Sequence, residues 1–272
     1  MRLSLSISPC PNDTFMMDAI INRKINLHGY EFDVTFQDID LLNREAKNSS
    51  ADITKISCGV LPAILGEYQV LNSGAALGVG NAPLLVSRHK IYPDELHHCK
   101  VAIPGFDTTA ALLLKYTFPQ VKELKSYLFS NIAEAIIADE VDAGVLIHEE
   151  RFVYKQKSLQ LIADLSDKWQ EQLKLPIPLG LIAIKSGIDQ RVKTDIAQLI
   201  QESIAFGFAN PHSSWSFIKE HARYINDDVI ESHIKMFVND FSLDMGDSGR
   251  DSIMKMIELS GIDINAQNKI FI

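Results

Sequence analysis

A short apolar run leads directly into charged residues in the segment Ala143-Gly144-Val145-Leu146-Ile147-His148-Glu149-Glu150-Arg151-Phe152. Such a run, bounded by polar side chains, is typical of a buried strand, which we predict at 142–147. In α/β sheets, ligands bind just beyond the carboxyl ends of the strands. His148 stands at that point and its imidazole titrates near neutral pH, so it is a candidate general base. The alternative is a structural histidine that closes a core strand.

Strand and helix patterns alternate on both sides of this segment. Period-two alternation and short apolar runs predict strands at 3–7, 30–36, 52–56, 68–71, 84–87, 100–103, 125–129, 142–147, 159–163 and 179–184. Apolar residues spaced three and four apart predict helices at 13–22, 39–46, 59–65, 108–116, 132–138, 191–209, 213–222, 227–238 and 248–260. This order of elements predicts an α/β fold.

The order of the elements also predicts how the chain is divided. Strands and helices alternate up to residue 184, and the rest of the chain is helical. We predict a larger α/β lobe formed by residues 1–87 and 180–272, with a smaller α/β lobe, residues 88–179, inserted between its halves. Two lobes joined by two crossing segments form a ligand cleft that opens and closes, as in periplasmic binding proteins.

Composition is that of a soluble globular protein, with 46% hydrophobic and 22% charged residues. The net charge of −9 argues against affinity for nucleic acid or for an anionic membrane, but it is compatible with a small anionic substrate. Cys10, Cys58 and Cys99 show no C-x-x-C spacing, which favours reduced thiols over a disulfide framework. Because the sequence has neither a signal-peptide pattern nor a run that could span a bilayer, we expect a cytoplasmic protein.

The first predicted strand ends in the turn Ser8-Pro9-Cys10-Pro11-Asn12-Asp13-Thr14, which should face the cleft. Its prolines fix the backbone. Asn12 and Asp13 offer polar groups either to a site or to the cap of the following helix. Cys10 is either a nucleophile with His148 as its base or a small buried apolar residue.

Two further segments place polar groups at predicted strand ends. In Thr54-Lys55-Ile56-Ser57, Lys55 offers a positive charge and Ser57 a hydroxyl, although a solvated lysine and a helix-capping serine fit equally well. In Pro104-Gly105-Phe106-Asp107-Thr108-Thr109-Ala110, a glycine turn leads into a helix that starts with adjacent threonines. Backbone N–H groups, hydroxyls and the helix dipole converge there, which predicts a carboxylate site. Asp107 as a plain helix cap is compatible with that site.

The remaining motifs do not predict a cofactor or metal site. The glycine-rich segment 74–81 lacks G-x-G-x-x-G spacing and is followed by Pro83, so we interpret it as a flexible joint rather than a dinucleotide site. The histidines show no metal-ligand spacing, and we predict no metal site. Glu149 and Glu150 either orient His148 or are solvated, and we expect at least one of them to be solvated.

Taken together, the motifs resemble those of the 1,4-dihydroxy-6-naphthoate synthase family, which belongs to the futalosine route to menaquinone. The segments that carry the resemblance are Ser8-Pro9-Cys10-Pro11-Asn12-Asp13-Thr14-Phe15, Thr54-Lys55-Ile56-Ser57, Gly74-Ala75-Ala76-Leu77-Gly78, Pro104-Gly105 with Thr108-Thr109, Ile147-His148-Glu149-Glu150-Arg151-Phe152, Leu175-Pro176-Ile177-Pro178-Leu179-Gly180 and Asn239-Asp240-Phe241-Ser242-Leu243-Asp244. They cover nearly the whole chain, and their number and order are far more specific than any single motif.

The resemblance implies a two-lobed fold like that of type II periplasmic binding proteins, and a lyase that converts cyclic dehypoxanthinylfutalosine to 1,4-dihydroxy-6-naphthoate. It implies that His148 is the proton acceptor and that no metal or redox cofactor is needed, because aromatisation drives the reaction. The substrate contacts it implies are Lys55, Ile56 and Ser57 from one lobe and Thr108, Thr109 and Ala110 from the other. We expect a second layer of residues to contact these side chains without touching the substrate; its members are Cys10, Asn12, Asp13 and Glu149.

Two other functions remain open on the sequence alone, and both involve a small molecule. A solute-binding protein of the same shape would bind its ligand without converting it, and the lack of an export signal counts against it. A chorismate dehydratase of the same fold and pathway is the second alternative. The His148-Glu149 segment and the turn around Cys10 count against that enzyme.

Overall fold

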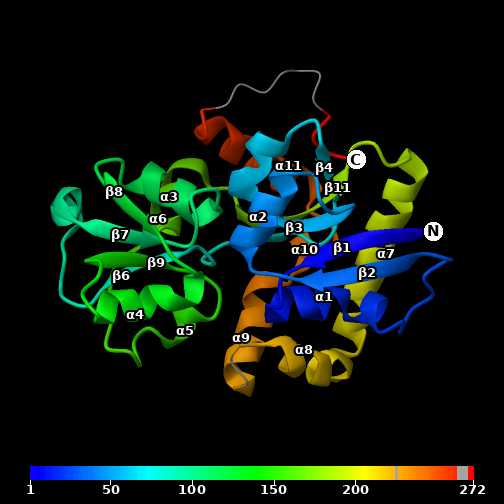
Figure 1. The fold of residues 1–272 in the computed structure, drawn as a ribbon, viewed down its shortest axis with the longest axis horizontal. Helices are drawn as coiled ribbons and strands as arrows, with labels where there is room; N and C mark the ends of the chain where they lie inside the picture. The colour runs from blue at the N-terminus through cyan, green and yellow to red at the C-terminus, as the bar shows by residue number, and fades with distance from the viewer. Residues whose placement is uncertain (224–225, 262–268) are drawn as a thin grey trace.

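Two β-sheets lie side by side in this computed structural model, which describes residues 1–223, 226–261 and 269–272 (Figure 1). The chain passes from the first sheet to the second after residue 78 and returns before residue 177. Each sheet and the helices packed on it form one lobe. The predicted two-lobed α/β fold is therefore confirmed.

The first sheet has the strand order β2-β1-β3-β11-β4, with β5 paired to β11. Its strands are β1 (Arg2–Ile7), β2 (Glu31–Phe36), β3 (Ile53–Ser57), β4 (Tyr68–Val70), β5 (Ala76–Gly78) and β11 (Ile177–Lys185). β1 runs parallel to β2 and β3, whereas β11 is antiparallel to β3, β4 and β5. β1 and β3 therefore end at the same edge of the sheet.

The second sheet has the strand order β10-β6-β9-β7-β8. Its strands are β6 (Leu84–Ser87), β7 (Lys100–Ile103), β8 (Glu123–Ser126), β9 (Ala143–Leu146) and β10 (Gln160–Asp164). β7 is parallel to β8 and β9. The assignment of residues 84–87 to the larger lobe is wrong, because β6 pairs with β9 and β10 in the second sheet. A short apolar run does not indicate which sheet it joins.

Helices cover both sheets, and most lie close to their predicted positions. They are α1 (Pro11–Ile21), α2 (Ile39–Lys47), α3 (Thr109–Thr117), α4 (Ile132–Ile137), α5 (Glu150–Val153), α6 (Ser166–Leu173), α7 (Gln190–Ala209), α8 (Trp215–His221), α9 (Asp227–Phe237), α10 (Asp240–Leu243) and α11 (Gly246–Leu259). The helix predicted at 59–65 is a 3₁₀ helix, Cys58–Ile64, because Pro62 removes a backbone donor. The sequence pattern misses α5, α6 and α10, which have only four to eight residues, and it takes β5 for a joint.

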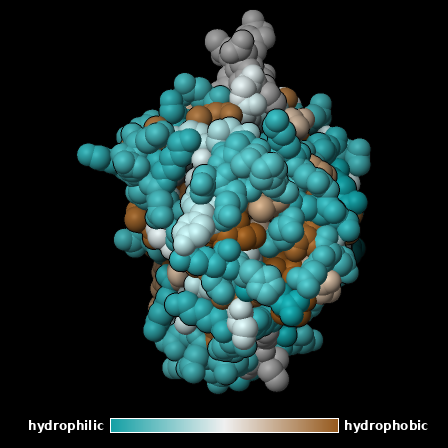
Figure 2. Space-filling view, turned by 90° about the vertical axis from the view of Figure 1, so that its left-hand side faces the viewer, coloured by the Kyte–Doolittle hydropathy of each residue, from teal (hydrophilic) through white to brown (hydrophobic). Residues whose placement is uncertain are grey.

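Buried apolar side chains form clusters on both faces of the first sheet. On one face, Met16, Ile182 and Ile204 pack in a cluster built with α1 and α7. On the other face, a larger cluster contains Val145 of the second sheet as well as Leu181 of the first, so the lobes share a core. The outer face of the second lobe is mostly hydrophilic, with scattered apolar residues (Figure 2). No helix in the described ranges is long and apolar enough to cross a membrane.

Candidate functional site

A cavity lies between the lobes, where the carboxyl ends of β1, β3, β7 and β9 meet. A position between two lobes is typical of a small-molecule site. The lining residues are Ser8, Asn12, Asp13, Ile39, Lys55, Ser57, Ala76, Asn81, Ala82, Pro83, Thr108, Thr109, Ala110, Ile147, His148, Arg151, Leu179, Gly180 and Phe237. Apart from Ile56, all the residues predicted to contact the ligand face this one cavity.

The side chain of Ile56 lies elsewhere. Successive residues of a strand point to opposite faces of its sheet. Lys55 and Ser57 therefore share the cavity side of β3, whereas Ile56 is fully buried in the core cluster on the opposite side. The prediction that Ile56 contacts the substrate is wrong for its side chain.

His148 follows β9 and has a left-handed backbone with φ of +52°. Few residues other than glycine adopt this conformation, and it persists only where the surrounding structure holds it. The ring of Phe129 meets the imidazole edge-on at a centroid distance of 4.9 Å, and the ring of His233 is stacked parallel to it at 6.0 Å. Burial, aided by the charge of Lys55 and opposed by Asp13, lowers the pKa of His148 to about 4. The imidazole is neutral at pH 7 and is able to accept a proton.

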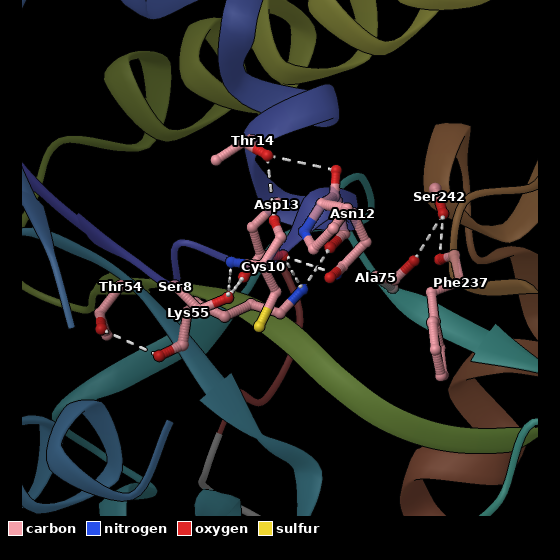
Figure 3. Close-up of polar contacts among 12 residues, drawn as sticks. Ser8, Cys10, Asn12, Asp13, Thr14, Thr54, Lys55, Ala75, Phe237 and Ser242 are labelled. Atoms are coloured by element: carbon pink, nitrogen blue, oxygen red, sulfur yellow. Dashed lines mark hydrogen bonds and ion pairs between the residues drawn. The ribbon is translucent and has the colours of Figure 1, made fainter. Parts of the chain in front are cut away.

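Lys55 and Asp13, both in the lining of the cavity, form a buried ion pair (Figure 3). Lys55 Nζ is 2.8 Å from Asp13 Oδ1, and the two side chains are 5% and 1% exposed. The Ser8 hydroxyl donates to Asp13 Oδ2 at 2.6 Å, and Asn12 Nδ2 donates to Asp13 Oδ1 at 2.9 Å. The cap interpretation of Asp13 is wrong, because Cys10 occupies the N-cap of α1 and Pro11 its first position. Asp13 lies in the first turn, and its carboxylate faces Lys55.

His233 is a candidate site residue that the sequence analysis missed. It is fully buried on α9, and its Nε2 lies 2.9 Å from Asn12 Oδ1. Because Asn12 Nδ2 donates to Asp13, Asn12 Oδ1 must accept, so His233 carries its proton on Nε2. The available signal was its place between Ile230 and Phe237 on the buried face of an amphipathic helix.

Ser57 and the start of α3 form the other polar part of the cavity. Asn43 donates to Ser57 Oγ at 3.0 Å, which leaves the hydroxyl proton of Ser57 available to a ligand. The Thr108 hydroxyl caps α3 and donates to Gly105 O, and the Thr109 hydroxyl donates to Leu179 O. Both threonine hydroxyls are therefore engaged in the fold. The first backbone amides of α3, at Thr109 and Ala110, have no carbonyl partner within the helix and face the cavity end.

Cys10 and Glu149 line a second cavity, which also contacts His148. Glu149 and Glu150 are both buried, so the expectation that at least one of them is solvated is wrong. Glu150 forms an ion pair, with Lys157 Nζ 3.0 Å from its Oε2. Burial raises the pKa of Glu149 to about 7.

Cys10, His148 and Glu149 have the spacing of a metal site, since their ligand atoms lie within 4.8 Å of one another. Burial and the charge of Glu149 raise the pKa of the Cys10 thiol well above its usual value. A metal ion would have to displace the thiol proton. Sequence spacing gave no sign of this group, because Cys10 is distant from the other two residues in the chain.

Gly59 connects the two lobes at the start of α3, and we expect Gly59→Ala to disturb the site. Its amide donates to Thr109 Oγ1 at 3.0 Å, and an added Cβ would lie 2.7 Å from the backbone carbon of Thr108. The backbone must shift, so we expect a loss of about 1–3 kcal/mol in the free energy of unfolding and a raised KM. Urea unfolding and steady-state kinetics measure both. Gly187→Ala, which meets no atom within 4 Å, is the matched control. Equal behaviour of the two variants would show that α3 is not held through Gly59.

The chain matches the family model described as menaquinone biosynthesis over residues 3–261. It is 35% identical over 260 residues to a 1,4-dihydroxy-6-naphthoate synthase of Streptomyces coelicolor, which covers 94% of this chain and 91% of that protein. It is 31% identical over 273 residues to the 1,4-dihydroxy-6-naphthoate synthase of Thermus thermophilus, which covers 99% of each chain.

Solved structures agree with this relationship. Protein AF1704 from Archaeoglobus fulgidus superposes with a TM-score of 0.90 at 32% identity, over 96% of this chain and 97% of that chain. A Candida albicans protein described as having the generic periplasmic binding protein fold superposes with a TM-score of 0.71 at 12% identity, over 99% of this chain and 93% of its own, and shows the fold alone. Because the family model and the sequence relatives cover nearly all of it, the chain belongs to the menaquinone-biosynthesis family.

Proposed function

We propose that this protein is a lyase that converts cyclic dehypoxanthinylfutalosine to 1,4-dihydroxy-6-naphthoate. The names of the two bacterial relatives support the reaction. The observation that carries the proposal in the structure is His148, a neutral imidazole held in a left-handed conformation and facing the cavity between the lobes. A base of this kind suits removal of a proton beside a carbonyl group.

We infer that the substrate binds with its ring system against the apolar walls of the cavity and its carboxylate at the polar end. The apolar walls include Ala82, Pro83, Leu179 and Phe237, against which a bicyclic ring system can pack. We place the carboxylate at the first amides of α3, where the helix dipole favours negative charge and Ser57 offers its hydroxyl proton. The ring that reacts then lies toward His148.

His148 begins the reaction by accepting a proton next to a carbonyl group of the substrate. The electron pair left behind moves onto the carbonyl oxygen. As the bond to the sugar-derived portion breaks, its electron pair departs with that portion, which takes up a proton, and the remaining ring system becomes aromatic. No electrons are gained or lost overall, so the chemistry requires no redox cofactor. Closure of the lobes would exclude water during these steps.

The acidity of His148 predicts an unusual pH profile. The base must be neutral to act, and its pKa of about 4 lies well below the usual 6.5. Activity should therefore stay level as the pH falls from 7 to about 5 and decline only as His148 is protonated near pH 4. The measurement is kcat/KM against pH, with unfolding followed in parallel. An acid limb centred near pH 6.5 would contradict a base whose pKa is lowered to about 4.

A conversion assay tests the proposed function. Purified protein is incubated with cyclic dehypoxanthinylfutalosine in the presence of a metal chelator, and the naphthoate product is followed by chromatography. We expect product without added cofactor. Binding without conversion would favour the solute-binding protein. Conversion of chorismate in a parallel reaction, with no naphthoate formed in the first, would favour the dehydratase.

A further inference from the structure

Arg151 is a cation in the wall of the cavity, and the proton transfer to His148 does not involve it. It lies on α5, close after His148 in the chain, and its side chain is 8% exposed. Its Nη2 donates to the backbone oxygen of Gly80 at 3.2 Å. The guanidinium therefore approaches the cavity from the same segment as the proposed base.

The charge of Arg151 is poorly compensated within the protein. Asp164, the acidic partner that forms its ion pair, lies 3.9 Å from Nη2, beyond hydrogen-bond distance. Asp164 Oδ1 instead accepts hydrogen bonds from the amide and hydroxyl of Ser166 at 2.8 and 2.6 Å. Nη1 of Arg151 is buried and has no hydrogen-bond partner in the part of the chain that the structure describes. A buried donor of a charged group is costly to leave unpaired. Because Arg151 lines the cavity, a ligand bound there is a candidate source of the acceptor that Nη1 lacks.

We propose that Arg151 is a catalytic residue whose Nη1 donates a hydrogen bond to the substrate oxygen that becomes negative when His148 removes the proton. The inference rests on the proposed function and adds a second group to it. The C–H bond breaks, its proton goes to His148, and its electron pair moves onto the carbonyl oxygen beside Arg151. That pair then returns to form a ring double bond as the bond to the sugar-derived portion breaks, and the electron pair of the broken bond leaves with that portion, which takes up a proton.

The position of Arg151 favours this oxygen over the fixed carboxylate of the substrate. Arg151 and His148 belong to one segment of the second lobe and line the same cavity, so we place both beside the ring that reacts. The carboxylate already has a site at the start of α3, with Ser57 beside it. A donor in a water-excluded pocket stabilises a charge that develops there much more than the same donor in water.

The experiment compares Arg151→Ala and Arg151→Lys with the wild-type protein, using cyclic dehypoxanthinylfutalosine as substrate. We expect Arg151→Ala to lower kcat by about 10²–10³-fold, the usual effect of losing such a donor, with the dissociation constant of the substrate changed by less than about threefold. Arg151→Lys should retain part of the activity. Added guanidinium at low millimolar concentration should restore turnover to Arg151→Ala, whereas urea, a neutral molecule of the same shape, should not. The control is Arg250→Ala, because Nη2 of Arg250 contacts Asn72 outside the cavity. Its turnover should change with neither guanidinium nor urea.

Three results would overturn the inference. Weaker substrate binding with unchanged kcat would mean that Arg151 holds the fixed carboxylate. Unchanged kinetics would mean that it has no role in the reaction. Arg151→Ala could instead lose kcat, melt at a lower temperature and show no rescue by guanidinium. Together with wild-type kcat in folded Arg151→Lys, that result would mean that Arg151 has a structural role. If the wild-type protein itself makes no naphthoate, the proposed function fails first and this inference fails with it.

Discussion

His148→Gln should lose turnover by about 10²–10⁴-fold and still bind substrate. Glutamine is similar in size to the imidazole and keeps polar atoms in the cavity, but it cannot take up a proton as a general base. Cavity contacts made by α3, Ser57 and the apolar walls remain, so affinity should change little. Single-turnover kinetics measures the chemical step, and calorimetry with the same substrate measures binding.

Two further variants decide how His148 is interpreted. His97→Gln changes an exposed histidine far from the cavity lining and should behave as the wild-type protein. Cys10→Ala removes the thiol beside His148 and should retain turnover. If His148→Gln has normal activity, His148 is a structural histidine and not the base. Loss of turnover in Cys10→Ala, with binding and fold intact, would show that His148 does not act alone.

Asp13→Ala should lower the free energy of unfolding by about 3–5 kcal/mol, because it leaves the ammonium group of Lys55 buried without its counter-charge. Adding Lys55→Met to the same chain should recover most of that loss, since no uncompensated charge remains. The double variant should fold but bind substrate more weakly, because the cavity has lost a cation. Urea unfolding of the single and double variants, read as a double-mutant cycle, gives the coupling between the two side chains.

The control for this pair is an ion pair at the surface. Lys219 Nζ lies 2.6 Å from Asp227 Oδ1, with both side chains substantially exposed, so Asp227→Ala should cost only a small fraction of the loss in Asp13→Ala. Equal losses in the two variants would contradict a buried pair. If the double variant has the same free energy of unfolding as Asp13→Ala, the loss in Asp13→Ala comes from packing rather than from the unpaired charge of Lys55.

Local patterns predicted the elements of the fold well but not their long-range pairing. The strands at 84–87 and 100–103 agree with the structure to the residue, because each is a short apolar run between turn residues. Which sheet Leu84–Ser87 joins depends on partners far along the chain, and β6 was assigned to the wrong lobe. The error at Cys58–Ile64 is local: the spacing of its apolar residues predicted an α-helix, but Pro62 within the segment removes a backbone donor and the helix is 3₁₀.

The site was predictable where residues follow strands and unpredictable where packing brings them together. Ser57 ends β3 and His148 follows β9, and the rule for ligand position in α/β sheets is enough to propose them. Lys55 lies two residues before the end of β3 and faces the same cavity. Asp13 looked like a helix cap, because nothing local shows that Lys55 lies beside it. His233 comes from a helix near the end of the chain, and only the fold stacks it on His148. That Arg151 Nη1 has no hydrogen-bond partner among the described residues is likewise visible only in the folded protein.

A crystal structure of His148→Gln with cyclic dehypoxanthinylfutalosine would show where the substrate binds relative to the proposed base, because that variant should bind the substrate without consuming it. We expect the ligand in the cavity between the lobes, with its carboxylate within about 3 Å of the first amides of α3. We also expect the reacting carbon within about 3.5 Å of the side chain at position 148. A ligand in the neighbouring cavity beside Cys10 and Glu149, or one with its carboxylate turned toward position 148, would rule out His148 as the base that removes this proton.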